Sequence, residues 1–313
     1  MPQEYPIILR GFPGTVQVVD GVEYAPGRLA DVYLPVEAAK PVPTILFLHA
    51  GGWLHGDRKF GPDLGRFFTQ RGFAMVSIDY RLSDEALFPA AVHDVKTAVR
   101  WMRSVAGEYG FNPNRIGVWG LSAGGHLAAL AAISGEEDFV GEGDPHREFS
   151  SSVQAVVAGY PPVDFNQFAA DEGSFEAKLL GAPLSSVLEL VRQANPAAYV
   201  KGPGAPPILL VHGSDDQVVP SSQSEMLFDA LGVAGNDVTM CLIEGMGHGF
   251  MNKNDFDQRE FKRVKKYECR NGEPPLYVWD CGDFLPAEFV VCVVMIEVAP
   301  TASSAATIGE WRI

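Results

Sequence analysis

The 313-residue chain is 47% hydrophobic, which is enough to bury a large core and fits one catalytic domain over residues 1–313. Lys and Arg number 24 against 39 Asp and Glu, and the net charge of −15 argues against a nucleic-acid or anionic-membrane partner. The N-terminus has no basic flank leading into a long apolar stretch, and no apolar span of about 18 residues follows. We therefore expect a cytoplasmic protein with no signal peptide or transmembrane segment.

Short apolar and β-branched runs predict strands, which fall in chain order at residues 16–19, 29–34, 44–48, 74–79, 115–119, 153–159, 207–211 and 238–243. Helical runs lie between the later strands, at about residues 62–70, 90–109, 122–133 and 223–231. Alternating strands and helices favour an α/β fold, with a mostly parallel eight-stranded sheet covered by helices on both faces. In such sheets the loops at the carboxyl ends of the strands carry function.

A serine lies on the turn between the fifth predicted strand and the helix that follows it. The segment reads Gly120-Leu121-Ser122-Ala123-Gly124. On so sharp a turn a serine adopts a strained backbone conformation with its hydroxyl exposed, and flanking glycines let neighbouring backbone pass without a Cβ clash. The alternative is an ordinary turn with a capping serine. The strand before and the helix after favour the nucleophile elbow of a hydrolase, with Ser122 as nucleophile.

Two adjacent glycines follow the strand predicted at 44–48, in the segment His49-Ala50-Gly51-Gly52-Trp53. Adjacent glycines at this place can direct backbone N–H groups into a pocket. A serine that attacks an ester needs such donors, because the tetrahedral intermediate carries an oxyanion. We therefore predict that the N–H groups of Gly51, Gly52 and Ala123 form an oxyanion hole.

The acid and the base of a catalytic triad are expected downstream, each on a loop that follows a strand. The loop after 207–211 carries two neighbouring carboxylates, Asp215 and Asp216, and the loop after 238–243 carries His248. His248 is the only one of the seven histidines that follows these acids. The chain order Ser, Asp, His is that of α/β hydrolases and differs from the orders in chymotrypsin and subtilisin.

The other histidines have simpler interpretations. We expect His49 and His212 to brace glycine turns by hydrogen bonds, and His93 and His126 to be packed or surface residues of helices. His55 lies near the predicted pocket, where contact with substrate is the alternative to a solvated loop position.

From about residue 44 to residue 250 the chain resembles the α/β-hydrolase superfamily, and in detail the hormone-sensitive-lipase-like and the xylan-acetyl and feruloyl esterase-like carboxylesterases. The matching motifs are His49-Ala50-Gly51-Gly52-Trp53, Asp79-Tyr80-Arg81-Leu82, Phe88-Pro89-Ala90-Ala91 followed by Asp94, the serine elbow, His212-Gly213-x-x-Asp216-x-x-Val219-Pro220, and Gly247-His248-Gly249-Phe250.

The resemblance implies the α/β-hydrolase fold, with Asp216 rather than Asp215 as the acid of the triad. It also places the oxyanion donors at Gly51 and Gly52. The chain departs from the family pattern at Ala50, where the family usually has the first glycine of a run of three. The predicted hole is intact provided that Ala50 needs no positive φ.

Two segments are interpreted as additions to the central sheet. The connection at 161–205 is long, contains several aromatic residues and a predicted helix at 184–193, and is predicted to be a small cap over the pocket; the alternative is a helix that packs beside the sheet. Trp53 and Phe250 are candidate substrate-binding residues. The atypical C-terminal segment at 254–313 leaves an added edge strand, a dimer-forming strand and a divergent tail open.

These features predict a serine carboxylesterase that hydrolyses short-acyl alkyl, aryl or acetylated-sugar esters through an acyl-enzyme intermediate. We expect no metal or organic cofactor and a small-molecule ester as partner, and we leave a homo-oligomer open. An amide-cleaving enzyme, such as an arylformamidase or an aminopeptidase-like hydrolase, would use the same residues. A catalytically silent binding protein would lack a member of the triad, and none is missing from the sequence.

Overall fold

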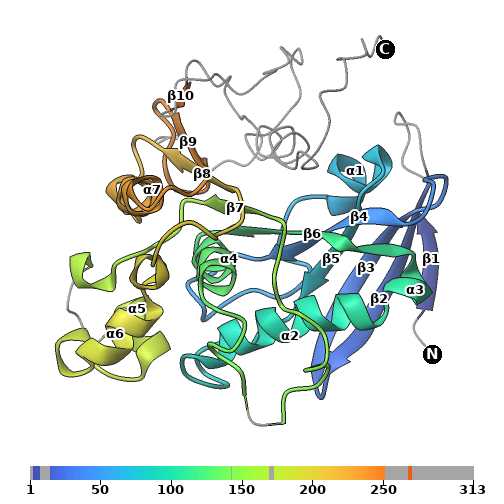
Figure 1. Ribbon diagram of the computed structural model, residues 1–313, viewed down its shortest axis with the longest axis horizontal. Helices are drawn as coiled ribbons and strands as arrows, with labels where there is room; N and C mark the ends of the chain where they lie inside the picture. Colours follow the sequence, from blue (N-terminus) through green and yellow to red (C-terminus); the bar gives the residue numbers. More distant parts are fainter. Residues whose placement is uncertain (1–2, 8–14, 142, 169–172, 251–266, 270–313) are drawn as a thin grey trace.

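The computed structural model describes residues 3–7, 15–141, 143–168, 173–250 and 267–269 (Figure 1). Within them the strands form one sheet in the order β1-β2-β3-β5-β4-β6-β7-β8-β9-β10. The strands are β1 (Gln3–Ile7), β2 (Val16–Ala25), β3 (Arg28–Pro35), β4 (Val42–Leu48), β5 (Ala74–Ile78), β6 (Phe111–Leu121), β7 (Ala155–Gly159), β8 (Ile208–Gly213), β9 (Val238–Ile243) and β10 (Tyr267–Cys269). No helix among the described residues combines the length and the apolar character that a bilayer crossing requires.

The centre of the sheet is parallel and its edges are antiparallel. Strands β5, β4, β6, β7, β8 and β9 pair in parallel. Strands β1, β2 and β3 form an antiparallel edge next to β5, and β10 pairs antiparallel with β9. The strands predicted from the sequence are β2 to β9, so the predicted α/β-hydrolase sheet is confirmed. The two outermost strands were missed because β1 contains a proline and β10 has only 3 residues, too few for an alternating pattern.

The helices depart from the predicted runs mainly where a single residue interrupts them. The α-helices are α1 (Leu64–Phe67), α2 (Ala90–Ser104), α3 (Ala106–Tyr109), α4 (Ala123–Ile133), α5 (Phe175–Leu180), α6 (Leu188–Ala194) and α7 (Ser222–Val233). The 3-10 helices are η1 (Thr69–Arg71), η2 (Phe165–Gln167), η3 (Leu184–Ser186), η4 (Pro196–Tyr199) and η5 (His248–Phe250). Val105 has φ −100° and ψ 10° and divides the predicted helix 90–109 into α2 and α3. Val187, with φ −131° and ψ 43°, separates η3 from α6 within the predicted helix 184–193.

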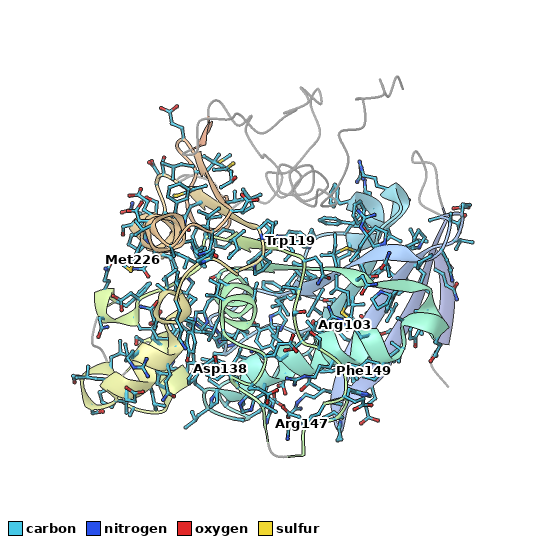
Figure 2. The ribbon with its side chains drawn as sticks, in the orientation of Figure 1. Arg103, Trp119, Asp138, Arg147, Phe149 and Met226 are labelled. Carbon is cyan, nitrogen blue, oxygen red and sulfur yellow. The ribbon has the colours of Figure 1, made fainter. Side chains whose placement is uncertain are left out.

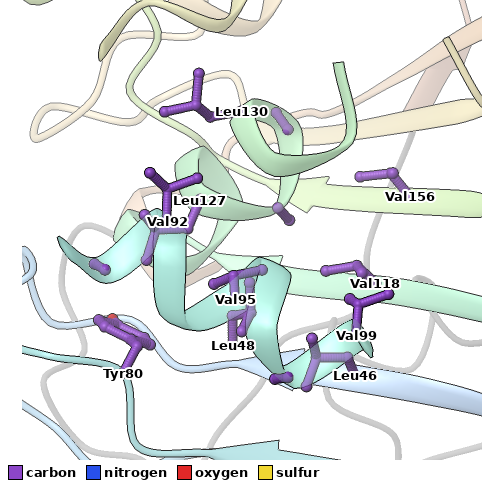
Figure 3. Packing of buried hydrophobic residues seen from close by; sticks show 14 of the residues in the cluster. Leu46, Leu48, Tyr80, Val92, Val95, Val99, Val118, Leu127, Leu130 and Val156 are labelled. Carbon is purple, nitrogen blue, oxygen red and sulfur yellow. The ribbon is translucent and has the colours of Figure 1, made fainter. Parts of the chain in front are cut away.

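Helices cover both faces of the sheet, as predicted. Because side chains alternate along a strand, Leu46 and Leu48 of β4 join a larger core with α2, α4 and α7, whereas Ile45 and Phe47 join a smaller core with α1. Figure 3 shows part of the larger core, in which side chains of α2 and α4 lie against the strands: Val92, Val95, Val99, Leu127 and Leu130. The continuous apolar run of β4 is explained by its burial on both faces.

The connection between β7 and β8 folds as the short helices η2, α5, η3, α6 and η4. In Figure 1, α5 and α6 lie together at the opposite end of the molecule from β1, β2 and β3. Several apolar side chains of α5, η3 and α6 belong to the larger core, among them Leu179, Leu180, Leu184, Val191 and Ala194. The segment is therefore packed against the central domain along much of its length. The sequence did not predict α5, which has only 6 residues.

Basic side chains of α2 hold the connection between α4 and β7. Lys96, Arg100 and Arg103 lie at spacings of four and three, on one face of the helix. They donate to backbone carbonyl oxygens of this connection, namely those of Gly135, Glu136, Ser150 and Ser152. Figure 2 labels Arg103 on α2, and Asp138, Arg147 and Phe149 on this connection. Burial lowers the pKa of Lys96 to about 8. These contacts explain why a largely buried helix carries three cations, because they satisfy carbonyl groups that no strand or helix pairs.

Candidate active site

Ser122 lies on the turn between β6 and α4. Its φ of 53° and ψ of −117° form a conformation that costs a non-glycine residue about 1–3 kcal/mol. The N–H of Ser122 donates to Gly159 O at 2.8 Å and helps to hold this turn. A Cβ at Gly124 would lie 2.2 Å from Leu48 O, so α4 packs this closely on β4 only with glycine there. The strain and the glycine are those expected of the predicted elbow.

Three side chains that are distant in the sequence meet at the carboxyl ends of β6, β8 and β9. Ser122 Oγ lies 3.1 Å from His248 Nε2, and His248 Nδ1 lies 2.8 Å from Asp216 Oδ2. Since a carboxylate only accepts, Nδ1 carries the hydrogen, and Nε2 accepts from the Ser122 hydroxyl. The structure thus brings the predicted serine, histidine and aspartate into one hydrogen-bonded chain, in the order needed to move a proton from serine to histidine.

The Asp216 carboxylate is buried and has donors on both oxygens. Oδ1 accepts from the N–H groups of Val218 and Val219 at 2.9 Å each, while Oδ2 accepts from His248 and lies 3.3 Å from His212 Nε2. Burial by itself raises the pKa of this carboxyl, but the hydrogen bonds from His212 and His248 outweigh it and hold the pKa well below its usual range. Asp216 is therefore an ionised, fixed partner for the imidazole.

The neighbouring carboxylate makes different contacts. Asp215 Oδ1 accepts from Ser214 Oγ at 3.2 Å, and its backbone N–H donates to Met246 O at 2.9 Å. The side chain that reaches His248 is that of Asp216. The geometry thus distinguishes the two carboxylates that residue types alone left open.

The loop after β4 holds two glycines in conformations that other residues avoid. Gly51 has φ 122° and Gly52 has φ 60°. A Cβ at Gly51 would lie 2.0 Å from His55 O, which leaves no space for a side chain. Ala50, where the related enzymes usually have glycine, is not among the described residues with positive φ, so the alanine fits this turn.

The predicted oxyanion donors are not used by the fold. Among the residues that the structure describes, none accepts a hydrogen bond from the N–H groups of Gly51, Gly52 or Ala123. Ala123 is the first residue of α4, where backbone N–H groups have no partner within the helix. These groups can therefore donate to an oxyanion.

An ion cluster that the sequence did not predict anchors this loop to the sheet. Arg58 Nε lies 2.7 Å from Asp31 Oδ1 on β3, and Arg58 Nη1 lies 2.7 Å from Asp79 Oδ2 after β5. The side chain of Asp31 is 1% exposed, and burial is the largest effect that raises its pKa. The only sequence signal was the motif Asp79-Tyr80-Arg81-Leu82, whose contacts could not be deduced from spacing.

The other residues of this motif also serve the loops around the site. The Tyr80 hydroxyl donates to His49 O at 2.8 Å, and the two rings are stacked with centroids 4.2 Å apart. His49 Nδ1 donates to Ala50 O at 2.7 Å, so His49 braces the turn, as predicted. Arg81 pairs with Asp94 of α2 at 2.7 Å. These residues position the loop, and within the described part of the chain none of them forms a hydrogen bond or ion pair with Ser122.

The structure describes the side chain of only one of the two predicted substrate-binding residues. Trp53 is 1% exposed and packs against His126 and Phe165, with ring centroids 5.2 and 5.4 Å away. Its position next to the glycines suggested a pocket wall, but its side chain turns into the core, so this prediction is corrected. Phe250 ends η5, and its side chain lies outside the described part of the chain.

A different aromatic residue lies over the glycine loop. Phe175, the first residue of α5, is 44% exposed, and its ring covers Gly52 so closely that a Cβ there would lie 2.6 Å from it. The His55 ring lies edge-on to Phe175 with centroids 6.4 Å apart. The connection at 161–205 therefore contacts the loop that carries the predicted oxyanion donors. No sequence pattern distinguished Phe175 from the other phenylalanines of this segment.

Two hollows of about 320 Å³ each lie away from this site. Both are lined by Ile133 and Gly204. Ile133 ends α4, whose 11 residues place it about 16 Å from the elbow at 1.5 Å per residue. Neither hollow is lined by Ser122, His248 or Asp216. Within the described ranges, no group of three or more His, Cys, Asp or Glu side chains is arranged to hold a metal ion.

A strained serine, a histidine and an ionised aspartate at the carboxyl ends of parallel strands are the arrangement of the α/β-hydrolase serine hydrolases. Residues 30–231 match the BD-FAE family model, and the chain belongs to this family of α/β-hydrolase esterases.

Known relatives are named as esterases. The chain is 33% identical over 233 residues to Esterase LipC of Mycobacterium tuberculosis, covering 72% of this chain and 57% of LipC. Among solved structures, it resembles a truncated form of a carbohydrate esterase from gut microbiota, with a TM-score of 0.69 and 32% identity over 74% of this chain and 89% of that one. It also resembles a butyrate-bound thermophilic esterase from Thermogutta terrifontis, with a TM-score of 0.60 and 27% identity over 74% of this chain and 83% of that one. The chain spans about half the length of the curated relatives it matches.

Proposed function

We propose that this protein is a serine carboxylesterase that hydrolyses short-acyl esters through an acyl-enzyme. The main observation behind the proposal is a pair of hydrogen bonds. Ser122 Oγ lies 3.1 Å from His248 Nε2, and His248 Nδ1 lies 2.8 Å from Asp216 Oδ2. These distances are within the reach needed for proton transfer between a nucleophile and its base. No metal or organic cofactor takes part in the proposed reaction.

In the proposed first half-reaction, Ser122 Oγ forms a bond to the ester carbonyl carbon while its proton moves to His248 Nε2. The oxyanion of the resulting intermediate accepts from the N–H groups of Gly51, Gly52 and Ala123. The intermediate collapses, the ester C–O bond breaks, and the leaving alcohol takes the proton from His248. Asp216 keeps the imidazole in the productive tautomer and stabilises its positive form.

In the second half-reaction, His248 Nε2 takes a proton from water as the water oxygen bonds to the acyl carbon. The second tetrahedral intermediate then releases the carboxylic acid, and Ser122 Oγ recovers its proton from His248. The histidine therefore acts as base and as acid once in each half-reaction, and the enzyme returns to its starting state.

The preference for short acyl groups is supported by two observations. Phe175 lies directly over Gly52, so the connection at 161–205, which we propose to be a cap, restricts the space above the glycine loop. The Thermogutta terrifontis esterase to which the chain is similar was solved with butyrate. The resemblance to a carbohydrate esterase favours acetylated sugars among the esters to be tested.

A substrate panel tests the proposal. Initial rates of hydrolysis are measured at saturating substrate. The panel contains p-nitrophenyl acetate, butyrate, octanoate and palmitate, acetylated and feruloylated sugars, and matched anilides. We expect the acetyl and butyryl esters to be hydrolysed fastest and the anilides slowest. Faster cleavage of the anilides would contradict the esterase assignment, and faster cleavage of palmitate would contradict the short-acyl preference. Ser122→Ala should lose ester turnover, whereas the control Ser134→Ala, which changes a buried serine at the other end of α4, should retain it.

A further inference from the structure

We infer that His212 is a positioning residue for the triad acid, so that the hydrogen-bonded chain from Ser122 continues beyond Asp216 into α7. This inference rests on the proposed function, because Asp216 is the acid of that function. The sequence predicted only that His212 braces a glycine turn.

His212 lies near the end of β8 and has no exposed surface. Its Nε2 lies 2.8 Å from Val219 O and 3.3 Å from Asp216 Oδ2, and its Nδ1 lies 2.7 Å from Ser224 Oγ. A carbonyl oxygen only accepts, so Nε2 carries a hydrogen, which it shares between Val219 O as the nearer acceptor and Asp216 Oδ2. Ser224, on α7, fixes the other ring nitrogen. The imidazole is thus held on both sides.

The oxygen that His212 approaches is the one that matters for the proposed chemistry. Asp216 Oδ2 also accepts from His248 Nδ1, whereas Oδ1 is occupied by two backbone N–H groups. His212 and His248 therefore meet at one oxygen, where each constrains the position of the carboxylate. Without His212, Oδ2 keeps His248 as its donor but loses the second contact, and a carboxylate with fewer donors is more basic.

The consequence for the base has a defined direction. Among the residues that the structure describes, the ionisable groups in contact with His248 are Asp216 and Tyr160, whose ring centroid lies 4.7 Å from the imidazole. Asp216 is in turn faced by His212. A more basic Asp216 binds the protonated form of His248 more strongly. Loss of His212 should therefore shift the acidic limb of the kcat/KM profile to higher pH, whereas a role confined to loop folding would leave the position of this limb unchanged.

The first test compares His212→Phe with His212→Gln, using p-nitrophenyl acetate as the probe. Phenylalanine preserves the ring shape but removes both nitrogens, whereas glutamine retains an N–H at a similar reach. For His212→Phe we expect kcat to fall about tenfold to a hundredfold, the size expected for a hydrogen bond to a charged group, with KM changed less than about twofold. For His212→Gln we expect partial recovery of kcat and a smaller shift of the acidic limb. Equal losses in both variants with an unmoved acidic limb would overturn the inference.

A second variant decides the question if His212→Phe does not fold. Ser224→Ala removes the partner of His212 Nδ1 and leaves the contacts of Asp216 in place. We expect kcat to fall about threefold to tenfold and the acidic limb of the kcat/KM profile to shift to higher pH, as in His212→Phe. The matched control is Ser134→Ala, because the buried Ser134 hydroxyl donates to Leu130 O at 2.6 Å and has no contact with the triad. Wild-type kcat and pH profile in Ser224→Ala would overturn the inference. An inactive wild-type enzyme would instead contradict the proposed function, so the two failures are distinguishable.

Discussion

The two loops that supply the candidate site are held in place in different ways. The turn that carries Asp216, in the loop after β8, is held largely by its own residues. Asp216 accepts from the N–H groups of Val218 and Val219, and His212 donates to Val219 O. These partners lie within eight positions of one another, so the turn is encoded in a short stretch of sequence, while Ser214 and Asp215 also bond to the loop after β9.

The loop after β4 is held by side chains from elsewhere in the fold. Arg58 pairs with Asp31 and Asp79, which are 27 and 21 positions away. Asp31 lies on β3 in the antiparallel edge, so the geometry of the predicted oxyanion donors depends on that edge being folded. Substitution of Asp216 should therefore mainly affect catalysis, whereas substitution in the loop after β4 or of its anchors should affect catalysis and stability together.

The largest effect on kcat is expected for Asp216, in the loop after β8. Asp216→Asn should lower kcat by about 10⁴, because an amide cannot hold the imidazole in the productive tautomer, while the melting temperature changes little. Asp215→Asn is the matched control and should retain most activity. Steady-state kinetics on p-nitrophenyl acetate, with thermal melts of the same samples, provide the comparison. A dead Asp215 variant beside an active Asp216 variant would show that the acid is wrongly assigned.

In the glycine loop, Gly52→Ala should lower kcat by about 10²–10³, because a Cβ there would overlap the Phe175 ring and displace an oxyanion donor. Since Gly52 has φ 60°, the variant should also be less stable. Gly27→Ala separates these effects, because Gly27 has φ 71° but nothing lies within 4 Å of its added Cβ. If Gly27→Ala lost as much activity as Gly52→Ala, the loss in both variants would have to be assigned to backbone strain alone.

Removal of the Arg58 side chain, which anchors the loop after β4, should affect both stability and catalysis. Arg58→Met should reduce the free energy of unfolding by about 2 kcal/mol at pH 8, less than the 3–5 typical of a fully buried pair, because Lys59 still reaches Asp31. The pKa of Asp31 is already raised by burial, and losing Arg58 raises it further. A carboxyl whose folded pKa exceeds its unfolded value costs stability as the pH rises between the two, so the deficit should be smaller at pH 4 than at pH 8.

Urea denaturation across this pH range, with kcat measured on the same samples, checks the anchor prediction. Arg192→Met is the control, because Arg192 and Glu189 form an exposed pair and should contribute nothing measurable. A stability deficit in Arg58→Met that grows toward acidic pH would refute the role given to Asp31.

The smallest effect is expected where the cap segment meets the glycine loop. Phe175→Ala should raise KM several-fold for aryl esters and leave kcat within about twofold, because the half-exposed ring contacts the loop but holds no reacting atom. Leu188→Ala, at a 62% exposed position on α6, is the control and should behave as wild type. An unchanged KM for Phe175→Ala across the ester panel would remove this ring from the substrate site.

What the sequence predicted and what it missed follow the same division between local and distant contacts. The elbow at Ser122, the order of Asp216 and His248, and eight strands were readable because each depends on residue types within a few positions. The link between Arg58 and Asp31 and the place of Phe175 over Gly52 depend on the tertiary fold. The error at Trp53 has the same origin, since its neighbours do not reveal which way its ring turns.

Two further sets of predictions have different outcomes. The breaks at Val105 and Val187 arise from the backbone of single residues, which hydrophobic periodicity does not register. The predictions for 254–313 fall outside the described residues, except where Tyr267–Cys269 forms β10 beside β9.

Covalent labelling of the nucleophile tests the role of Ser122 most directly. The wild-type protein is treated with a small organophosphate, and intact-mass and peptide mass spectrometry locate the adduct while residual ester turnover is followed. We predict one adduct per chain, on Ser122, formed in step with the loss of activity, and no adduct in Ser122→Ala. An adduct on another residue, or full ester turnover in Ser122→Ala, would contradict the assignment of this chain as an esterase that acts through Ser122.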